Sequence, residues 1–81
     1  MKRILLLEDD TLLGETIVQL PENENYSVDW AQDGEYAAGL SYDNSYDLYI
    51  FDVNVPFLDG FELLEALRDA RDVTPALFIS A

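Results

Sequence analysis

The sequence predicts an α/β fold in which a parallel sheet carries helices on both of its faces. Four short runs of apolar residues alternate with segments that have the spacing of amphipathic helices, and this alternation is typical of strand–helix–strand crossovers. Polar residues do not interrupt the first run, as expected of a strand buried on both faces of a parallel sheet. The 81 residues suffice for one small domain.

The first strand is expected at Ile4 to Leu7, where the acidic run Glu8-Asp9-Asp10 ends the apolar stretch. A helix is predicted from Thr11 to Leu20, with Asp10 as its N-cap. Pro21 lacks a backbone donor and clashes with the preceding turn, so we expect the helix to end or kink close to it. Three apolar residues share one stripe of this helix: Leu13, Ile17 and Leu20.

The second strand and helix follow a polar connector, Glu22 to Asn25. Tyr26 to Ala31 alternates between larger apolar and mostly polar residues, and this period of two predicts an edge strand. The turn Gln32-Asp33-Gly34 leads into a short helix, Glu35 to Tyr42, which a loop at residues 43–45 follows.

The third strand is predicted at Leu48 to Phe51 and ends on Asp52. After the loop Val53 to Leu58, Asp59 is expected to cap a helix from Gly60 to about Asp69. Three apolar residues of this helix are expected to face inward: Phe61, Leu64 and Leu67.

The last strand is predicted at Ala76 to Ile79, between Thr74-Pro75 and the final residues Ser80 and Ala81. No helix follows to cover this strand, whereas a complete doubly wound domain continues. We therefore expect the chain to be part of a longer protein.

Composition excludes several classes of function. A net charge of −13, from 17 acidic and four basic residues, excludes nucleic acid as a direct partner because phosphates would be repelled. Without cysteine or histidine, disulfides, classical zinc sites and histidine-based catalysis are absent. The apolar run after Met1-Lys2-Arg3 is too short for a signal peptide or a membrane span. We expect a soluble, cytoplasmic protein.

Functional side chains follow three of the predicted strands: Glu8-Asp9-Asp10, Asp52 and Ser80. Ligands of parallel α/β sheets bind beyond the carboxyl ends of the strands, so these side chains are expected to converge. Converging carboxylates share a proton or bind a cation, and oxygen ligands alone suit Mg²⁺. One carboxylate could then act as a nucleophile towards phosphorus and form an aspartyl phosphate.

These residues resemble the receiver domain of bacterial two-component response regulators, over essentially the whole chain. The acidic pair of that family corresponds to Glu8-Asp9, and its phosphoacceptor corresponds to Asp52. Residues 52–61, Asp-Val-Asn-Val-Pro-Phe-Leu-Asp-Gly-Phe, are similar to its signature loop. Residues 74–81 are similar to its fourth strand, which ends on a switch hydroxyl, here Ser80.

The resemblance implies a doubly wound, flavodoxin-like sheet with strand order 2-1-3-4. Asp9 and Asp52 would ligate Mg²⁺ directly, together with the backbone carbonyl of Asn54, and Glu8 would act mostly through water. Asp52 would accept phosphate from a phosphohistidine of a sensor histidine kinase. Ser80 would hydrogen-bond the phosphoryl oxygen. Such a module is a regulatory phosphoacceptor in a phosphorelay and not an enzyme.

The chain departs from the family in one residue and in length. The family's lysine at the end of its fifth strand has no counterpart, since the only lysine is Lys2. The fourth helix, fifth strand and fifth helix are also missing, so residues 1–81 would be the N-terminal part, about two thirds, of a receiver domain. We expect weak Mg²⁺ binding and impaired phosphorylation of the chain alone. Many similar proteins continue into a DNA-binding output domain.

Two other functions remain open at this point. Asp52-Val53-Asn54 is similar to the Asp-x-Asp motif of haloacid-dehalogenase-like phosphatases, but Asn54 could not replace the second aspartate as an acid–base residue. A protein-binding module that works without phosphorylation would fit the absent lysine. Taken alone, Glu8-Asp9-Asp10 could equally be a solvated turn, whereas Asp52 beside it favours a metal site; Asn54 could be an ordinary turn residue.

Self-association is a separate expectation for this chain. Residues 76–79 would form an open sheet edge, and one face of the sheet would lack a covering helix. Unpaired edges and exposed apolar patches drive association, so we expect a dimer or a higher oligomer.

Overall fold

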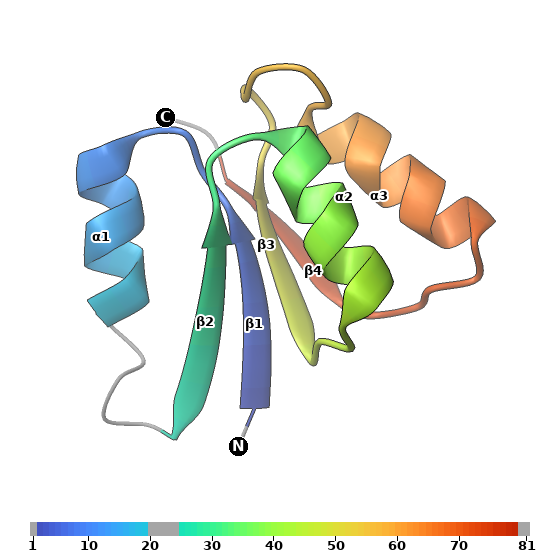
Figure 1. Ribbon diagram of the computed structural model, residues 1–81, viewed down its shortest axis with the longest axis horizontal. Coiled ribbons are helices and arrows are strands. Elements are labelled where there is room, and N and C mark those ends of the chain that lie inside the picture. The colour runs from blue at the N-terminus through green and yellow to red at the C-terminus, as the bar shows by residue number, and fades with distance from the viewer. Residues whose placement is uncertain (1, 20–24, 80–81) are drawn as a thin grey trace.

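The computed structural model describes residues 2–19 and 25–79, and these form a four-stranded parallel sheet with helices on both faces (Figure 1). The strand order is β2-β1-β3-β4, which confirms the predicted α/β architecture and strand order. The strands are β1 (Lys2–Leu7), β2 (Tyr26–Ala31), β3 (Leu48–Asp52) and β4 (Ala76–Ile79). In the described part of the chain β2 lies at one edge, as its alternating pattern predicted, and β4 lies at the other.

The pairing register sorts the strand residues onto two faces of the sheet. Leu7 of β1 pairs with Ala31 of β2 and with Phe51 of β3, so these three side chains share one face. The preceding residue of each strand points to the opposite face. Leu6 therefore lies beside Trp30 on that second face.

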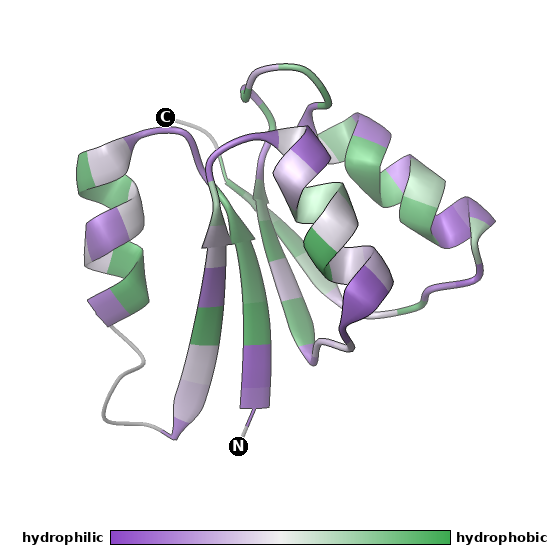
Figure 2. Ribbon diagram, in the orientation of Figure 1, coloured by the Kyte–Doolittle hydropathy of each residue, from purple (hydrophilic) through white to green (hydrophobic). Residues whose placement is uncertain are grey.

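The main core lies on the Leu7 face, beneath α2 (Gly34–Asp43) and α3 (Gly60–Asp69). The buried residues of this core come from the strands, the two helices and the loop before β3: Leu5, Leu7, Ala31, Ala37, Tyr46, Tyr49, Phe51 and Leu63. The rings of Tyr49 and Phe51 stack with centroids 5.0 Å apart, as expected for core aromatics. Figure 2 shows the hydrophobic residues concentrated in the central strands β1 and β3 and on parts of the helices.

On the second face, α1 (Thr11–Gln19) packs against β2. Gly14 lies so close to the Trp30 indole that a β-carbon there would clash with the ring, so glycine permits this approach. The predicted N-cap is confirmed, because the Leu13 amide donates to Oδ1 of Asp10 at 3.0 Å. Leu20 and Pro21, where the helix was expected to end or kink, lie outside the described residues.

The two remaining helices begin at aspartate caps. Asp33 accepts from the Tyr36 amide and starts α2 one residue earlier than predicted. Asp59 starts α3 at the predicted residue through a capping box, in which it accepts from the Glu62 amide at 2.8 Å. None of the helices in residues 2–19 and 25–79 combines the length and the apolar character that a membrane span requires.

One inward-facing residue of α3 was predicted wrongly. Phe61 is 58% exposed, and Leu63 is instead the buried apolar side chain of this helix. The helix is rotated because Gly60 rests on the end of β3, which turns Leu63 towards the core. Phe61 lies at the sheet edge, where its ring contacts that of Phe78 with centroids 4.5 Å apart. Leu64 and Leu67 pack against the core, as predicted.

Candidate metal centre

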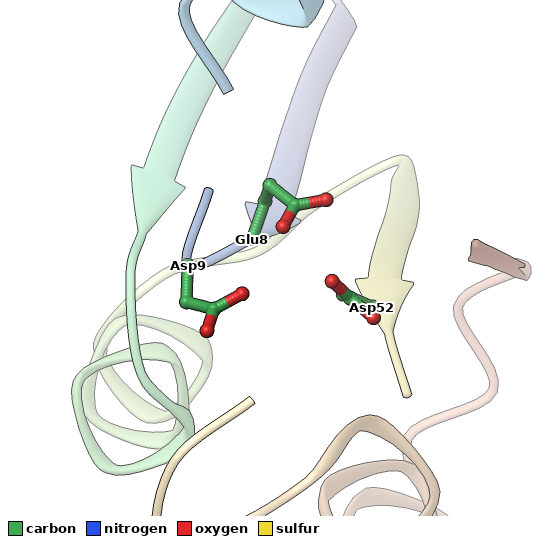
Figure 3. A group of neighbouring side chains, drawn as sticks. All are labelled: Glu8, Asp9 and Asp52. Atoms are coloured by element: carbon green, nitrogen blue, oxygen red, sulfur yellow. The ribbon is translucent and has the colours of Figure 1, made fainter. Parts of the chain in front are cut away.

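Three carboxylates meet at the carboxyl ends of β1 and β3. Glu8 and Asp9 directly follow β1, and Asp52 is the last residue of β3. Each offers an oxygen, and these oxygens all lie within 4.8 Å of one another. Figure 3 shows the three carboxyl groups pointing into one shared space. This grouping follows from the order of the strands, because β1 and β3 are direct neighbours although Glu8 and Asp52 are 44 positions apart in the sequence.

Glu8 is fixed on several sides. Its amide donates to the Ala31 carbonyl at 2.9 Å, which extends the pairing of β1 with β2 by one residue. Its carbonyl oxygen accepts from the Trp30 indole at 2.9 Å. In its carboxylate, Oε2 accepts from the Asp10 amide at 3.0 Å, whereas Oε1 is buried without a hydrogen-bond partner. A buried carboxylate oxygen without a partner is costly, so this atom calls for a proton or a cation.

The electrostatics of the cluster agree with that requirement. Burial, together with the neighbouring Asp52 and Asp9 carboxylates, raises the pKa of Glu8 to about 7, against the opposing effect of the Asp10 amide. Glu8 is only 1% exposed and Asp52 only 3%. Negative charges that are close together and shielded from water repel each other strongly, and a divalent cation relieves that repulsion.

Asp52 is oriented by the loop that follows it. Its Oδ1 accepts from the Asn54 amide at 2.9 Å. The Val53 amide donates to the Ile79 carbonyl at 3.1 Å, which ties the start of this loop to β4. On the other side Gly60 begins α3 so close that a β-carbon there would lie 2.5 Å from the Asp52 carbonyl oxygen. The Asn54 amide thus holds the Asp52 carboxylate, and the other two contacts fix the backbone that carries it.

The donor set fits a hard divalent cation. Three carboxylates supply oxygen ligands, and the chain has no histidine or cysteine to favour zinc. Mg²⁺ typically takes one or two protein carboxylates and keeps several waters. Asp9 is exposed while the other two carboxylates are buried, so the group offers ligands on a side that water can reach.

The predicted site residues have different outcomes. Glu8, Asp9 and Asp52 are brought together, as predicted. Asp10 serves as the cap of α1, through its contact to the Leu13 amide. Asn54 lies in the loop after β3, where its amide donates a hydrogen bond to Asp52. The role of its carbonyl as a metal ligand stays a prediction. Ser80 lies outside the described residues.

Two residues that support the site were not predicted from the sequence. Trp30 anchors the backbone of Glu8 from the edge strand, and Gly60 abuts the carbonyl of Asp52. The hydrogen bond of the indole forms because β2 lies beside β1. The alternating pattern of β2 predicts an edge strand but does not say which strand it neighbours. The Gly60 contact had one available signal, since a glycine directly after a helix cap suggests a close backbone approach.

Comparison with known proteins gives a consistent result. Residues 4–81 match the family described as "Response regulator receiver domain". The chain is 38% identical over 81 residues to the transcriptional regulatory protein PcoR of Escherichia coli, and 39% identical over 79 residues to RprY of Bacteroides fragilis. These matches cover 100% and 98% of the chain but 36% and 34% of the relatives. The chain thus spans about a third of the length of these curated relatives.

Solved structures agree with the sequence matches. The receiver domain of a Francisella response regulator superposes with a TM-score of 0.95 at 32% identity, covering 100% of this chain and 67% of that one. The response regulator TrrA of Thermotoga maritima, solved in complex with Mg²⁺-BeF, superposes with a TM-score of 0.92 at 30% identity. That comparison covers 100% of this chain and 70% of the TrrA chain.

Proposed function

The chain belongs to the response regulator receiver domain family, and from this premise we propose that Asp52 accepts a phosphoryl group from the phosphohistidine of a sensor histidine kinase in a Mg²⁺-dependent reaction. Members of this family are phosphoacceptor signalling modules and are regulatory, not catalytic. The observation that carries the assignment to Asp52 is the cluster itself. Asp52 ends a buried strand beside two further carboxylates, at the sheet edge where ligands of parallel α/β folds bind.

The proposed step is a transfer between two nucleophiles. A carboxylate oxygen of Asp52 attacks phosphorus and forms a new P–O bond. The P–N bond to the donor breaks, and its electron pair stays with the histidine, which leaves as neutral imidazole. The product is an aspartyl phosphate on this chain. The Asn54 amide already holds Oδ1 of Asp52 at 2.9 Å, so the side chain is oriented before the donor arrives.

The metal ligands of this proposal are Asp9, Asp52 and the backbone carbonyl of Asn54, with Glu8 acting through water. Mg²⁺ held by these residues would neutralise charge on the transferring phosphoryl oxygens. The unpartnered Oε1 of Glu8 supports this assignment, because it supplies an acceptor for a metal-bound water. TrrA, a relative at 30% identity, was solved with Mg²⁺-BeF, and this also supports the ion.

Ser80 is the proposed switch hydroxyl for the phosphoryl oxygens. It follows Ile79 in the sequence, and Ile79 pairs in register with Asp52. The family's lysine has no counterpart in residues 1–81, so we propose that these residues alone accept phosphate slowly. Labelling by acetyl phosphate, with and without Mg²⁺, tests the function in the complete natural protein and measures the deficit in the 81-residue chain.

Partners of the complete protein follow from the same reasoning. The kinase is the proposed phosphodonor, and a donor that is charged from ATP implies a cytoplasmic location. Matched relatives are named transcriptional regulators, so we propose that the complete protein regulates transcription through an output domain. The strongly acidic segment itself would not contact DNA.

Self-association is proposed for the 81-residue chain. Among the described strands β4 is an edge strand, and Leu77 on its α1-side face is 56% exposed. Phe78, on the other face, is also exposed. An apolar edge with unpaired backbone groups favours pairing with a second copy.

The remaining alternatives have less support. The family match sets aside a haloacid-dehalogenase-like phosphatase, because receiver domains are regulatory. A binding role without phosphorylation stays open only if Asp52 fails to accept phosphate, so the labelling experiment separates the two functions.

A further inference from the structure

Phe57 stands out because its backbone and its side chain are both unfavourably placed. Its φ of 71° lies in the left-handed region, which residues with a β-carbon rarely adopt. Its ring is 78% exposed, so burial of the ring does not offset this conformation. A residue held in a sparsely populated conformation without a packing reason is often a functional one.

The loop around Phe57 is fixed at several points. The Asn54 amide bonds to Asp52, and the Gly34 amide bonds to the Pro56 carbonyl at 3.4 Å. Leu58 packs against the core, and Gly34 lies directly against its carbonyl. These contacts hold both neighbours of Phe57 while its own ring points to solvent. The exposed ring is therefore presented by a constrained backbone and not by a free loop tip.

This loop joins β3 to α3 and rises above the carboxyl ends of the strands (Figure 1). Phe57 follows Asp52 by five residues, so its exposed ring belongs to the loop that leaves the sheet at the edge where the three carboxylates meet. Leu12 is exposed in the first turn of α1, the helix that directly follows the acidic run of Glu8 and Asp9. Any protein that brings a phosphoryl group to Asp52 approaches across this edge.

We infer that Phe57 is an anchor for the protein phosphodonor and helps to select it, an inference that rests on the proposed function of Asp52. Exposed aromatic side chains that are already ordered make strong contacts at the centre of interfaces. A second copy of this chain is disfavoured as the occupant of this edge, because each copy would bring its own acidic cluster to the contact. The fitting partner has an apolar pocket with a basic rim beside its phosphohistidine.

The test compares two donors on the complete natural protein. One is an autophosphorylated sensor histidine kinase, selected from a panel by its transfer to the wild type, and the other is acetyl phosphate. Phe57→Gly removes the ring and suits the positive φ, so its thermal midpoint should equal or exceed that of the wild type. We expect kcat/KM for the kinase to fall roughly tenfold or more, mainly through KM, with the acetyl phosphate rate unchanged within about twofold.

Two further variants complete the test. Phe57→Trp keeps a large aromatic ring and should retain most of the transfer from the kinase. Tyr42→Ala removes a ring that is 91% exposed at the last turn of α2 and should change neither rate. An equal loss with both donors, or no loss with either, would overturn the anchoring role. Absence of wild-type labelling by both donors would overturn the function of Asp52 itself.

Discussion

The indole nitrogen of Trp30 donates a hydrogen bond to the carbonyl oxygen of Glu8 at 2.9 Å. This bond joins the end of the edge strand β2 to the first residue of the acidic cluster. It also places the only tryptophan of the chain next to the candidate metal centre. The indole packs on α1 through Gly14, so one side chain connects the helix, the sheet edge and the site.

Loss of this bond should weaken both the fold and the site. In Trp30→Phe a ring remains, but the buried Glu8 carbonyl loses its donor, so we expect the free energy of unfolding to fall by about 1–2 kcal/mol. Urea unfolding followed by circular dichroism measures this difference. Tyr36→Phe, which removes an exposed hydroxyl from α2, is the control and should be neutral. Equal stability of Trp30→Phe and the wild type would show that the bond contributes nothing.

Glu8 should make the metal-free protein sensitive to pH. Its pKa rises from 4.5 to about 7 on folding, so the folded state holds a proton that the unfolded state releases. Stability should therefore fall as the pH rises from about 4.5 to 7 and level off above that range. Glu8→Gln cannot ionise and should flatten this dependence. Urea midpoints measured across this range check the expectation, and an unchanged slope in Glu8→Gln would contradict it.

Mg²⁺ affinity should show the opposite trend with pH. Proton loss from Glu8 adds a negative charge to the site, so binding should strengthen by up to about tenfold per pH unit below pH 7 and then become constant. Trp30 fluorescence provides the titration signal, because the indole contacts Glu8. Loss of the signal in Asp9→Asn together with Asp52→Asn would confirm that the cluster is the binding site. Binding that is unaffected by these changes would place the ion elsewhere.

Gly60 should be intolerant of a side chain. A β-carbon at this position would lie 2.5 Å from the Asp52 carbonyl oxygen, so Gly60→Ala should cost about 1–3 kcal/mol and displace the end of β3. Gly39→Ala is the matched control, because nothing lies within 4 Å of its position on α2. There the exchange should stabilise the protein by about 0.5–1 kcal/mol. Urea unfolding of both variants separates steric conflict from helix propensity, and equal effects would contradict the close approach.

Association of the 81-residue chain should depend on β4. Light scattering at micromolar concentration should give at least twice the monomer mass. Leu77→Lys places a charge on the exposed face of the edge strand and should shift the mass towards that of a monomer. Val73→Lys, at an exposed position before the strand, should leave the mass unchanged. A monomeric wild type would refute the proposed self-association.

The strands and caps could be predicted from sequence because local signals determine them. The bounds of β2 and β4 match the predicted ranges, and Asp10 and Asp59 cap the helices as expected. Phe61 was assigned to the wrong face, since the spacing of apolar residues in α3 fits two adjacent rotations of the helix. The contact of Gly60 with the end of β3 selects between them, and that contact is tertiary.

The candidate site was predictable in composition but not in detail. Strand-end carboxylates indicated Glu8, Asp9 and Asp52, although their convergence requires β1 and β3 to be neighbours, which the resemblance supplied. The unpartnered Oε1 of Glu8 and the indole bond of Trp30 depend on side-chain packing across strands. Periodicity and propensity contain no information about such contacts.

The central claim is that Asp52 is the phosphoacceptor. The most direct test incubates the complete natural protein with acetyl phosphate and Mg²⁺ and locates the modification by mass spectrometry. We expect one phosphoryl group on Asp52, lost when Mg²⁺ is chelated and absent from Asp52→Asn, with Asp47→Asn at the opposite end of β3 as the unaffected control. Unchanged labelling of Asp52→Asn would contradict the claim.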